Sequence, residues 1–362
     1  MRCLFVYRTF RRKAQTFDPL TVYLTPMNGG LRFAIVGCGK IAGRHAAEMA
    51  RHGVLVAVCD IVKEKADKLA SEFSAVAYYT ITDLLAGEKS LDVIAICTPN
   101  GLHAEHAILS LKAGSNVLCE KPLCISTADS NNMIAVAKEN QRKLFVVKST
   151  RYNPALAALK KIIEEKRLGT LYSFQLNCFW NRPDSYYADS WKGTAALDGG
   201  TLYTQFSHYI DALLWILGDV KKIAGFRKNS SHQHSIEFED CGVVSLEMEN
   251  GILGGLNWSV NTFQKNMEVS LTVIAEKGSI RIGGEYMNSI EYQLTDGVSL
   301  EPVPPGSAND YGSYKGSMSN HDKIYENLVK ALQDDAHPFA NATDGLKTVE
   351  TIERIYNSVS LS

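Results

Sequence analysis

Two patterns of hydrophobic and polar residues divide the chain near residue 150. From Leu31 to about Thr150, short apolar runs alternate with stretches whose apolar residues recur at helical spacing. Near-continuous apolar strands separated by helices predict a parallel sheet covered on both faces, and right-handed crossovers make it a doubly wound Rossmann fold. The predicted strands are Arg32–Val36, Leu55–Cys59, Val93–Cys97, Asn116–Cys119 and Lys143–Val147, and the predicted helices are Ile41–His52, Lys63–Phe73, His103–Ala113 and Thr127–Glu139.

Beyond a linking helix predicted at Pro154–Lys166, apolar and polar residues alternate with a period of two, as in Val243–Glu249. That period predicts an antiparallel sheet with one buried face. Further strands are predicted at Leu171–Trp180, Ile252–Val260, Val269–Val273, Ser279–Ile282 and Ile290–Leu294, helices at Thr201–Leu217, Asp322–Gln333 and Asp344–Val359, and a loop over Thr295–Ser319. The fold class is therefore α/β, with a Rossmann domain over residues 31–150 and an α+β domain over residues 151–362. The second domain has an open, mostly antiparallel sheet, and its final helices are candidates to pack back on the first domain.

The composition gives no reason to expect nucleic acid or a membrane as partner. The 362 residues are 45% hydrophobic and 21% charged, with a formal net charge of −1, as in ordinary globular proteins. No apolar run reaches the roughly 18 residues of a membrane helix. The eight cysteines show neither a CxxC pair nor zinc-type spacing, which predicts reduced thiols, a cytoplasmic location and no metal site.

Residues 1–30 form an extension of doubtful origin. The first 26 residues carry five basic side chains against one acidic side chain, Asp18. An arginine-rich, acid-poor start is typical of a transit peptide. The alternative, which we favour, is a translated upstream segment with Met27 as the native start.

A glycine-rich turn, Gly37-Cys38-Gly39-Lys40-Ile41-Ala42, follows the first predicted strand and opens a helix. Gly37 permits the tight turn, and Gly39 lets the backbone approach a pyrophosphate, which the helix N-terminus would bind. Asp60 ends the second strand, where a carboxylate accepts hydrogen bonds from ribose hydroxyls and repels a ribose phosphate, so NAD is favoured over NADP. A helix N-cap is the alternative role for Asp60.

Two further strand ends are expected at the same crevice, because the carboxyl ends of parallel strands meet at one edge. Thr98-Pro99-Asn100 follows one strand, and its alternative role is a simple turn. Lys121 follows another and precedes Pro122, which restricts its backbone. A partly buried lysine can exchange a proton with a substrate hydroxyl or hold the alkoxide. The alternative is a surface lysine paired with Glu120.

The predicted helix Thr201–Leu217 carries polar residues on an otherwise apolar background. Thr201, Gln205 and His208 follow the i, i+4, i+7 spacing of one face, which indicates a polar pocket in front of the histidine. A histidine suits a general base near neutral pH. Asp211 either orients the ring or forms a salt bridge or cap. Asp198-Gly199-Gly200 offers a cap and a close backbone approach before the helix.

These motifs, in this order, resemble the Gfo/Idh/MocA family of NAD(P)-dependent sugar and cyclitol dehydrogenases. The resemblance runs from about Leu31 to the end of the chain. It implies a Rossmann domain followed by an open sheet whose exposed face builds a homodimer or homotetramer, and it implies catalysis by Lys121 and His208. The residues assigned to NAD binding are Gly37, Gly39, Lys40, Ile41, Asp60, Thr98, Pro99, Asn100, His103, Glu120 and Lys121.

One departure from the family pattern is informative. Many members carry an aspartate four residues before the histidine, whereas this chain has Thr204, followed by Gln205. With Arg182 and Trp191-Lys192, this departure resembles the UDP-N-acetyl-2-amino-2-deoxyglucuronate dehydrogenases. That branch oxidises the sugar C3 hydroxyl in making surface polysaccharides, and some relatives recycle NADH with 2-oxoglutarate. The residues assigned to the substrate are Tyr152, Asn153, Arg182, Trp191, Lys192, Thr204, Gln205 and His208.

Two alternative functions stay open. A free sugar or inositol as substrate needs neither Arg182 nor Lys192, which would then be ordinary solvated loop charges. A catalytically silent NAD-binding regulator is the alternative from another class, because fold alone does not determine function. The presence of both Lys121 and His208 argues against the silent regulator.

Overall fold

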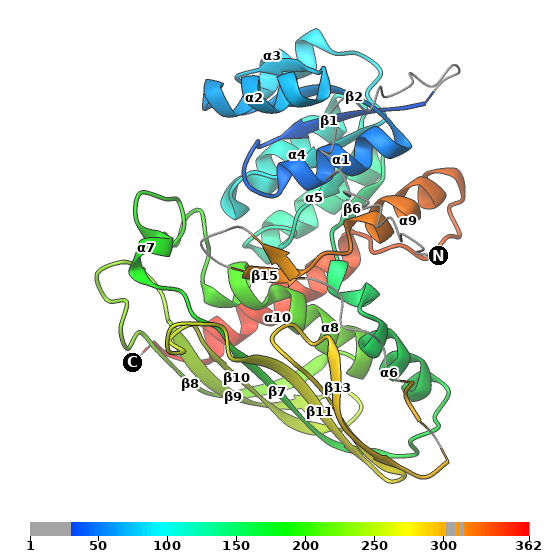
Figure 1. The fold of residues 1–362 in the computed structure, drawn as a ribbon, viewed down its shortest axis with the longest axis vertical. Helices are drawn as coiled ribbons and strands as arrows, with labels where there is room; N and C mark the ends of the chain where they lie inside the picture. The colour runs from blue at the N-terminus through cyan, green and yellow to red at the C-terminus, as the bar shows by residue number, and fades with distance from the viewer. Residues whose placement is uncertain (1–29, 298, 302–307, 311–314, 362) are drawn as a thin grey trace, which may run out of the picture.

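The computed structural model describes residues 30–297, 299–301, 308–310 and 315–361, and contains two large sheets with helices between and around them (Figure 1). The predicted start at Met27 and most of residues 1–30 lie outside the described residues. The first sheet is parallel, with strand order β3-β2-β1-β4-β5-β6. The predicted Rossmann sheet is therefore confirmed.

The strands of the first sheet are β1 (Leu31–Val36), β2 (Gly53–Cys59), β3 (Val76–Tyr78), β4 (Val93–Ile96), β5 (Asn116–Cys119) and β6 (Leu144–Val146). Its helices are α1 (Ala42–His52), α2 (Lys63–Phe73), α3 (Ile81–Gly87), α4 (His103–Lys112) and α5 (Thr127–Glu139). Alternate residues of β1 enter different cores. Phe33 packs in one core with Met49 of α1, and Ala34 packs in the other with Ala107 of α4. Both faces of the sheet are thus covered, as its apolar strands require.

The second sheet has seven strands in the order β13-β12-β11-β7-β10-β9-β8 and is antiparallel except between β7 and β10. Its strands are β7 (Leu171–Phe179), β8 (Val220–Lys228), β9 (Cys241–Met248), β10 (Leu253–Ser259), β11 (Glu268–Ala275), β12 (Gly278–Gly283) and β13 (Ser289–Thr295). Phe174, Leu176 and Cys178 of β7 are buried on one face. That face is covered by helices, and the other face is turned outward in Figure 1.

The helices of this half are α6 (Pro154–Glu164), α7 (Asp184–Tyr187), α8 (Ser207–Leu217), α9 (His321–Gln333) and α10 (Ala342–Ser358). Helix α9 returns to the Rossmann sheet, where Tyr325 and Leu328 share a core with Phe33. Helix α10 runs between the two halves, beside α5 and α8 (Figure 1). The final helices therefore tie the two sheets together.

Two predictions about this half need correction. The predicted loop Thr295–Ser319 contains a short hairpin of β14 (Ala308–Asp310) and β15 (Lys315–Met318), whose polar residues carry no strand pattern; other parts of that loop lie outside the described residues. The predicted helix Thr201–Leu217 is not uniform. It begins with a π turn over Leu202–Phe206, and α8 follows.

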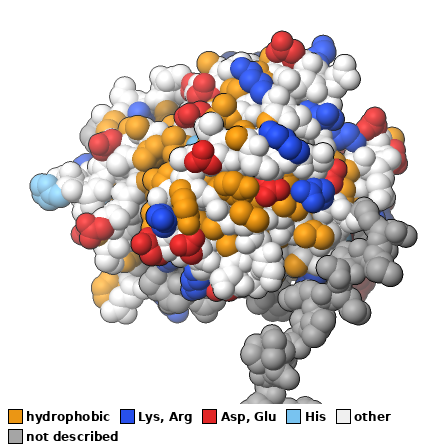
Figure 2. All heavy atoms as spheres, turned by 90° about the horizontal axis from the view of Figure 1, so that it is seen from above, with side chains coloured by type: hydrophobic (Ala, Val, Ile, Leu, Met, Phe, Trp, Pro, Cys, Tyr) orange, Lys and Arg blue, Asp and Glu red, His pale blue; other side chains and the backbone are white. Residues whose placement is uncertain are grey.

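The surface at the Rossmann end carries interspersed acidic and basic side chains, with apolar side chains between them (Figure 2). This mixture agrees with the formal net charge of −1. Among the described residues, no helix is long and apolar enough to cross a membrane. The seven described cysteines are all free thiols.

Candidate active site

The glycine turn lies between β1 and α1 and is shaped as the motif predicts. Gly37 has φ +98°, and a Cβ there would lie 2.6 Å from the backbone of Cys97, so only glycine fits. A Cβ at Gly39 would meet no atom of the described chain within 4 Å. The backbone at Gly39 therefore borders open space at a helix N-terminus, which fits the approach of a pyrophosphate. Lys40 in the same turn is exposed, and Ile41 is half-buried.

Asp60 follows β2 and braces this turn. One carboxylate oxygen accepts a hydrogen bond from the Cys38 N–H at 2.8 Å, and the other accepts one from the Val62 N–H at 2.8 Å. Neither contact is an N-cap of α2, whose N-cap residue is Val62. A carboxylate oxygen can accept more than one hydrogen bond, so the position remains compatible with the ribose contact predicted for NAD.

The segment after β4 was predicted to line the crevice, and it also contacts the second half of the chain. The Asn100 amide nitrogen donates to the carbonyl of Asp198 at 2.8 Å and to the Thr204 hydroxyl at 2.7 Å. The ring nitrogens of His103 lie 2.8 and 2.9 Å from the carbonyls of Pro122 and Thr98. Both side chains are buried. Both side chains thus help to position the loops around the crevice, and their predicted contact with the cofactor stays a prediction.

Glu120 is also buried and is held from two sides. Its carboxylate lies 3.0 Å from His45 Nε2 and 3.5 Å from His321 Nε2. Burial alone would raise the pKa of Glu120, but hydrogen bonds from His321 and His45 hold it well below its usual range. These three side chains are of metal-ligating types within 4.8 Å of one another, and the contacts of both imidazoles with the Glu120 carboxylate account for the arrangement. The other oxygen of Glu120 accepts from the Lys121 N–H at 3.0 Å.

Lys121 points from the end of β5 towards the π turn. Its Nζ donates to the carbonyl of Thr204 at 2.9 Å. Burial lowers the pKa of Lys121, while the charges of Glu120 and Asp198 oppose that shift. The lysine is therefore closer to exchanging a proton than an exposed lysine would be.

His208 is buried at the start of α8, within electrostatic reach of Lys121. Burial, and then the charge of Lys121, lower the pKa of His208 well below its usual value. The imidazole is therefore neutral near neutral pH, which is the state that a general base requires. The two residues predicted to be catalytic thus meet from the two halves of the chain.

The π turn changes which residues accompany His208. Because a π turn holds one more residue than an α turn, the predicted face of Thr201, Gln205 and His208 does not form. The Thr201 hydroxyl donates to the carbonyl of Glu239 at 2.5 Å, away from Lys121. Thr204 lies beside Lys121 instead, and the Gln205 amide donates to the Tyr186 hydroxyl at 3.0 Å.

Asp211 serves an ion-pair group that the sequence did not predict. Its carboxylate accepts two hydrogen bonds from Arg151, both at 2.8 Å, and lies 3.0 Å from Lys148 Nζ. Asp211 thus forms a salt bridge, one of its predicted roles, with a partner 60 positions away rather than on its own helix. Lys148 follows β6 as Lys121 follows β5. This position after a strand end is the sequence signal from which Lys148 could have been predicted.

Two of the predicted substrate cations lie in the wall of the site. Arg182 is only 2% exposed; its Nε donates to Gln205 at 2.8 Å and its Nη1 to Asn266 at 3.1 Å. Lys192 is half-buried, and its Nζ lies 4.6 Å from the centre of the Tyr186 ring and 5.5 Å from that of Trp191. Burial, and then the charge of Lys40, lower the pKa of Lys192. Neither cation is an ordinary solvated loop charge.

Tyr152 and Asn153 do not share this wall. Asn153 is fully buried, and its amide nitrogen donates to the carbonyls of Tyr286 and Met287 at 3.2 and 3.4 Å. Tyr152 is half-buried against the Rossmann core, and burial raises its pKa to about 12. Asn153 therefore has a structural role, and its assignment to the substrate stays a prediction.

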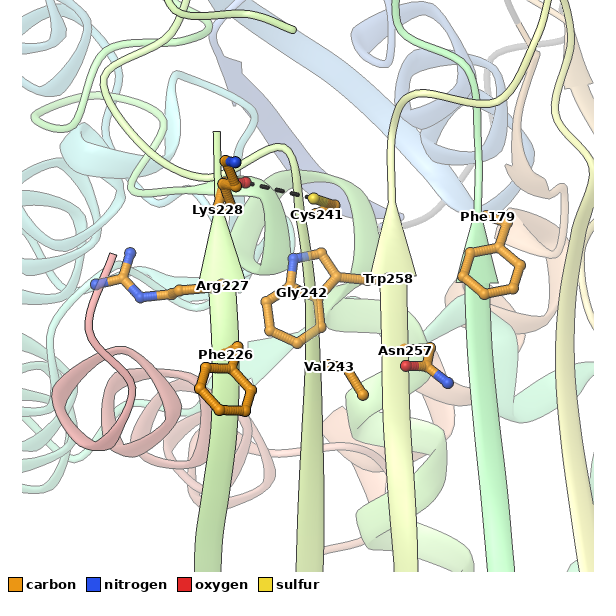
Figure 3. A pocket seen from close by; sticks show the side chains of 9 residues that line it. All are labelled: Phe179, Phe226, Arg227, Lys228, Cys241, Gly242, Val243, Asn257 and Trp258. Carbon is orange, nitrogen blue, oxygen red and sulfur yellow. Dashed lines mark hydrogen bonds between the residues drawn. The ribbon is translucent and has the colours of Figure 1, made fainter. Parts of the chain in front are cut away.

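A separate hollow lies on the outward face of the second sheet (Figure 3). Phe226 of β8, Val243 of β9, Asn257 of β10 and Phe179 of β7 line it. None of the residues predicted for the active site lines this hollow. It belongs to the surface that is predicted to assemble copies of the chain.

Two family models cover most of the chain. The model described as "Oxidoreductase family, NAD-binding Rossmann fold" matches residues 31–148, and the model of the GFO/IDH/MocA C-terminal domain matches residues 156–281. The chain belongs to the Gfo/Idh/MocA oxidoreductase family. Its open glycine turn fits the NAD that this Rossmann domain binds, and the protein is an NAD-dependent dehydrogenase of the sugar type.

Solved relatives of this Gfo/Idh/MocA protein share its fold over nearly the whole chain. The WlbA dehydrogenase from Bordetella pertussis, crystallised with NADH and UDP-GlcNAcA, is 32% identical with a TM-score of 0.81, covering 91% of this chain and 96% of its own. WlbA from Chromobacterium violaceum, crystallised with the same ligands, is 33% identical with a TM-score of 0.81, covering 92% and 94%. Among the relatives found by sequence, an inositol 2-dehydrogenase from Salmonella typhimurium is 28% identical over 256 residues, covering 68% of this chain and 72% of that protein.

Proposed function

We propose that the protein oxidises the C3 hydroxyl of UDP-N-acetylglucosaminuronic acid to the 3-keto sugar, with NAD as the hydride acceptor, in the biosynthesis of surface polysaccharides. The cations around the catalytic pair carry this proposal. The charges of Lys40, Arg182 and Lys121 all contribute to lowering the pKa of Lys192. A cluster of this kind suits a ligand with a diphosphate and a carboxylate. The two WlbA relatives crystallised with UDP-GlcNAcA support the same substrate.

The catalytic steps follow from the protonation states of the two residues. Neutral His208 takes the proton of the C3 hydroxyl, and the Lys121 ammonium stabilises the developing alkoxide and can relay the proton. NAD held at the Gly37–Gly39 turn and Asp60 would supply the acceptor for the C3 hydride. The products are the ketone, NADH and one proton, so atoms and charge balance.

Three further properties belong to this proposal. The free thiols of the described cysteines support a cytoplasmic location. The outward face of the second sheet supports a homodimer or homotetramer. Some relatives in the branch that this chain resembles reoxidise NADH with 2-oxoglutarate. The same reaction here would regenerate NAD, so that turnover would not require the release of NADH.

The proposal is tested by incubating the protein with NAD and UDP-N-acetylglucosaminuronic acid, with and without 2-oxoglutarate. We expect a product two mass units lighter and formation of NADH. The Lys121→Ala and His208→Ala variants should each lower kcat by roughly 10²–10⁴-fold. Because His208 is not among the residues assigned to NAD binding, His208→Ala should still bind NADH as the wild type does. A wild type that binds NADH but oxidises no sugar would favour a silent regulator, and unchanged turnover in both variants would overturn the assignment of the site.

Oxidation of a free sugar or inositol is the second candidate, because the inositol 2-dehydrogenase relative covers 68% of this chain. Lys192→Ala separates the two substrates. Loss of this cation should raise the KM for the nucleotide sugar about tenfold or more and leave the KM for a neutral inositol unchanged. Turnover of inositol but not of the nucleotide sugar by the wild type would favour the second candidate.

A further inference from the structure

Asp198 is a buried carboxylate next to the catalytic pair, in the turn before the π turn. It is only 1% exposed. One carboxylate oxygen accepts a hydrogen bond from the Gly193 N–H at 2.9 Å, and the other accepts one from the Thr204 hydroxyl. A buried carboxylate is costly unless it is hydrogen-bonded, and here both of its oxygens have partners.

Thr204 connects this carboxylate to the Rossmann half of the chain. The Asn100 amide nitrogen can only donate, so at 2.7 Å the Thr204 hydroxyl accepts from it. The hydroxyl proton is then directed to Asp198. Hydrogen bonds therefore run in one direction, from Asn100 through Thr204 to Asp198, and this polarity fits an ionised carboxylate.

The same threonine holds the catalytic lysine by its backbone. The Thr204 carbonyl accepts from Lys121 Nζ at 2.9 Å. The hydroxyl of Thr204 is fixed by Asp198, and its carbonyl is a fixed point for Lys121. A change at Asp198 is therefore transmitted to the lysine through one residue.

We infer that Asp198 is a positioning residue for Lys121, which it places through the hydroxyl and the carbonyl of Thr204. The negative charge of Asp198 also favours the protonated form of the lysine. Thr204 stands where the resemblance implies an aspartate, and Asp198 is the carboxylate that accepts the hydrogen bond of its hydroxyl. The inference rests on the proposed role of Lys121 and adds a residue to that site.

The charged and titratable groups around Asp198 allow a test by pH. Lys192 faces it from the loop after α7, Lys121 from the end of β5 and Tyr187 from α7. Burial raises the pKa of Asp198 to about 6, although its hydrogen bonds and Lys192 oppose the shift. Since the pKa of His208 lies well below 6.5, a loss of kcat/KM near pH 6 would report Asp198 rather than His208.

The test compares the wild type with Asp198→Asn. We expect the limb of the kcat/KM profile near pH 6 to disappear, and the limb that belongs to Lys121 to move to lower pH, because loss of a nearby negative charge disfavours the ammonium. Labelling of Lys121 with acetic anhydride over a pH series, measured by mass spectrometry, follows its pKa without any substrate. That pKa should fall by about one unit or more in Asp198→Asn.

Two further variants make the test specific. Glu237→Gln is the matched control, because Glu237 is exposed and holds the same loop through the Ala195 N–H at 2.7 Å; it should leave the Lys121 pKa unchanged. The double variant Asp198→Asn/Thr204→Asp moves the carboxylate to position 204, where the resemblance implies an aspartate, and should restore part of the lost rate.

Two labelling results would overturn the inference. One is a pKa of Lys121 that is unchanged in folded Asp198→Asn, and the other is a pKa that shifts equally in Glu237→Gln. If Asp198→Asn does not fold, Thr204→Val decides: it removes the hydroxyl link, and kcat equal to that of the wild type would overturn the inference. The labelling result is independent of whether the nucleotide sugar is the substrate, so failure of the proposed function is distinguishable.

Discussion

Asp211, Lys148 and Arg151 form a buried ion-pair group on which the stability of the molecule depends. Asp211 and Lys148 are each 2% exposed. The Asp211→Asn substitution leaves Lys148 without a carboxylate partner and leaves Arg151 with Asp344 alone, which should lower the free energy of unfolding by roughly 3–5 kcal/mol. Urea unfolding measures this change. Asp219→Asn is the control, since the Asp219–Lys347 pair is about half exposed and should contribute less than about 1 kcal/mol.

The pH dependence of this effect has a definite sign. Burial alone would raise the pKa of Asp211, but Lys148 and Arg151 hold it below its usual value. The stabilisation is therefore full above the unfolded pKa of about 3.9 and is lost as the pH falls through the lower folded pKa. The difference in unfolding free energy between wild type and Asp211→Asn should shrink in acid. A difference that stays constant from neutral pH into strong acid would contradict this account.

Single residues of the site could be predicted where chemistry and chain position coincide. Lys121 and Asp60 follow apolar strands, and strand ends meet at one edge of a parallel sheet. The roles of Asn153, Asn100 and Asp198 could not be predicted, because each depends on a partner far away in the chain. Asn153, for example, is buried against the backbone near residue 286, more than 130 positions away.

Most elements followed from periodicity, and the exceptions have physical reasons. Strand β3 is only three residues long, and β8 carries Lys221, Lys222 and Arg227 among its apolar positions. Neither gives a clear period of two. The π turn before α8 is a local insertion within a helical pattern, so the sequence predicted one continuous helix. The parallel pairing of β7 with β10 depends on the whole sheet and has no local signal.

Gly199 and Gly200 precede the π turn, and the conformation of Gly200 predicts how a substitution there affects stability. Gly200 has φ +139°, and a Cβ there would lie 2.3 Å from the Tyr356 hydroxyl, which accepts the Leu202 N–H at 3.0 Å. Gly200→Ala combines backbone strain with this clash and should cost roughly 2–5 kcal/mol of unfolding free energy. Gly251→Ala is the matched control, because Gly251 has φ +85° but a Cβ there would meet nothing within 4 Å.

Urea unfolding of both glycine variants separates strain from clash. Gly251→Ala should cost about 1–3 kcal/mol through strain alone. Gly200→Ala should also lower kcat, since the displaced Tyr356 supports the segment that carries Thr204 and His208. Equal losses of stability in the two variants would show that Tyr356 can move without cost.

At the scale of the whole molecule, the two halves are joined by contacts that also build the active site. Lys121 and Asn100 come from the Rossmann half, and Thr204 and His208 come from the other half. Helices cover the inner face of the second sheet, whereas its outer face is turned away from the rest of the molecule (Figure 1). Assembly through that outer face would therefore leave the catalytic contacts unchanged.

The outer face of the second sheet exposes large apolar side chains, and we expect copies of the chain to assemble through it. Phe226 is 75% exposed and Leu294 is 69% exposed, and Phe226 lines the hollow with Val243 (Figure 3). Phe226 on β8 pairs with Val243 on β9, whereas Leu294 lies on β13 at the opposite edge of the sheet. Exposed apolar surface such as that of Phe226 and Val243 marks an interaction site. Phe226→Glu would place a charge in an interface between copies, at a cost of several kcal/mol when like charges meet across it.

Light scattering after size exclusion measures the effect of Phe226→Glu on assembly. It should show a dimer or tetramer for the wild type and a smaller species for the variant. Val76→Glu is the control, since Val76 is 50% exposed on β3 of the other sheet, and it should keep the wild-type mass. A wild-type mass for Phe226→Glu, or a monomeric wild type, would show that this face does not assemble the protein.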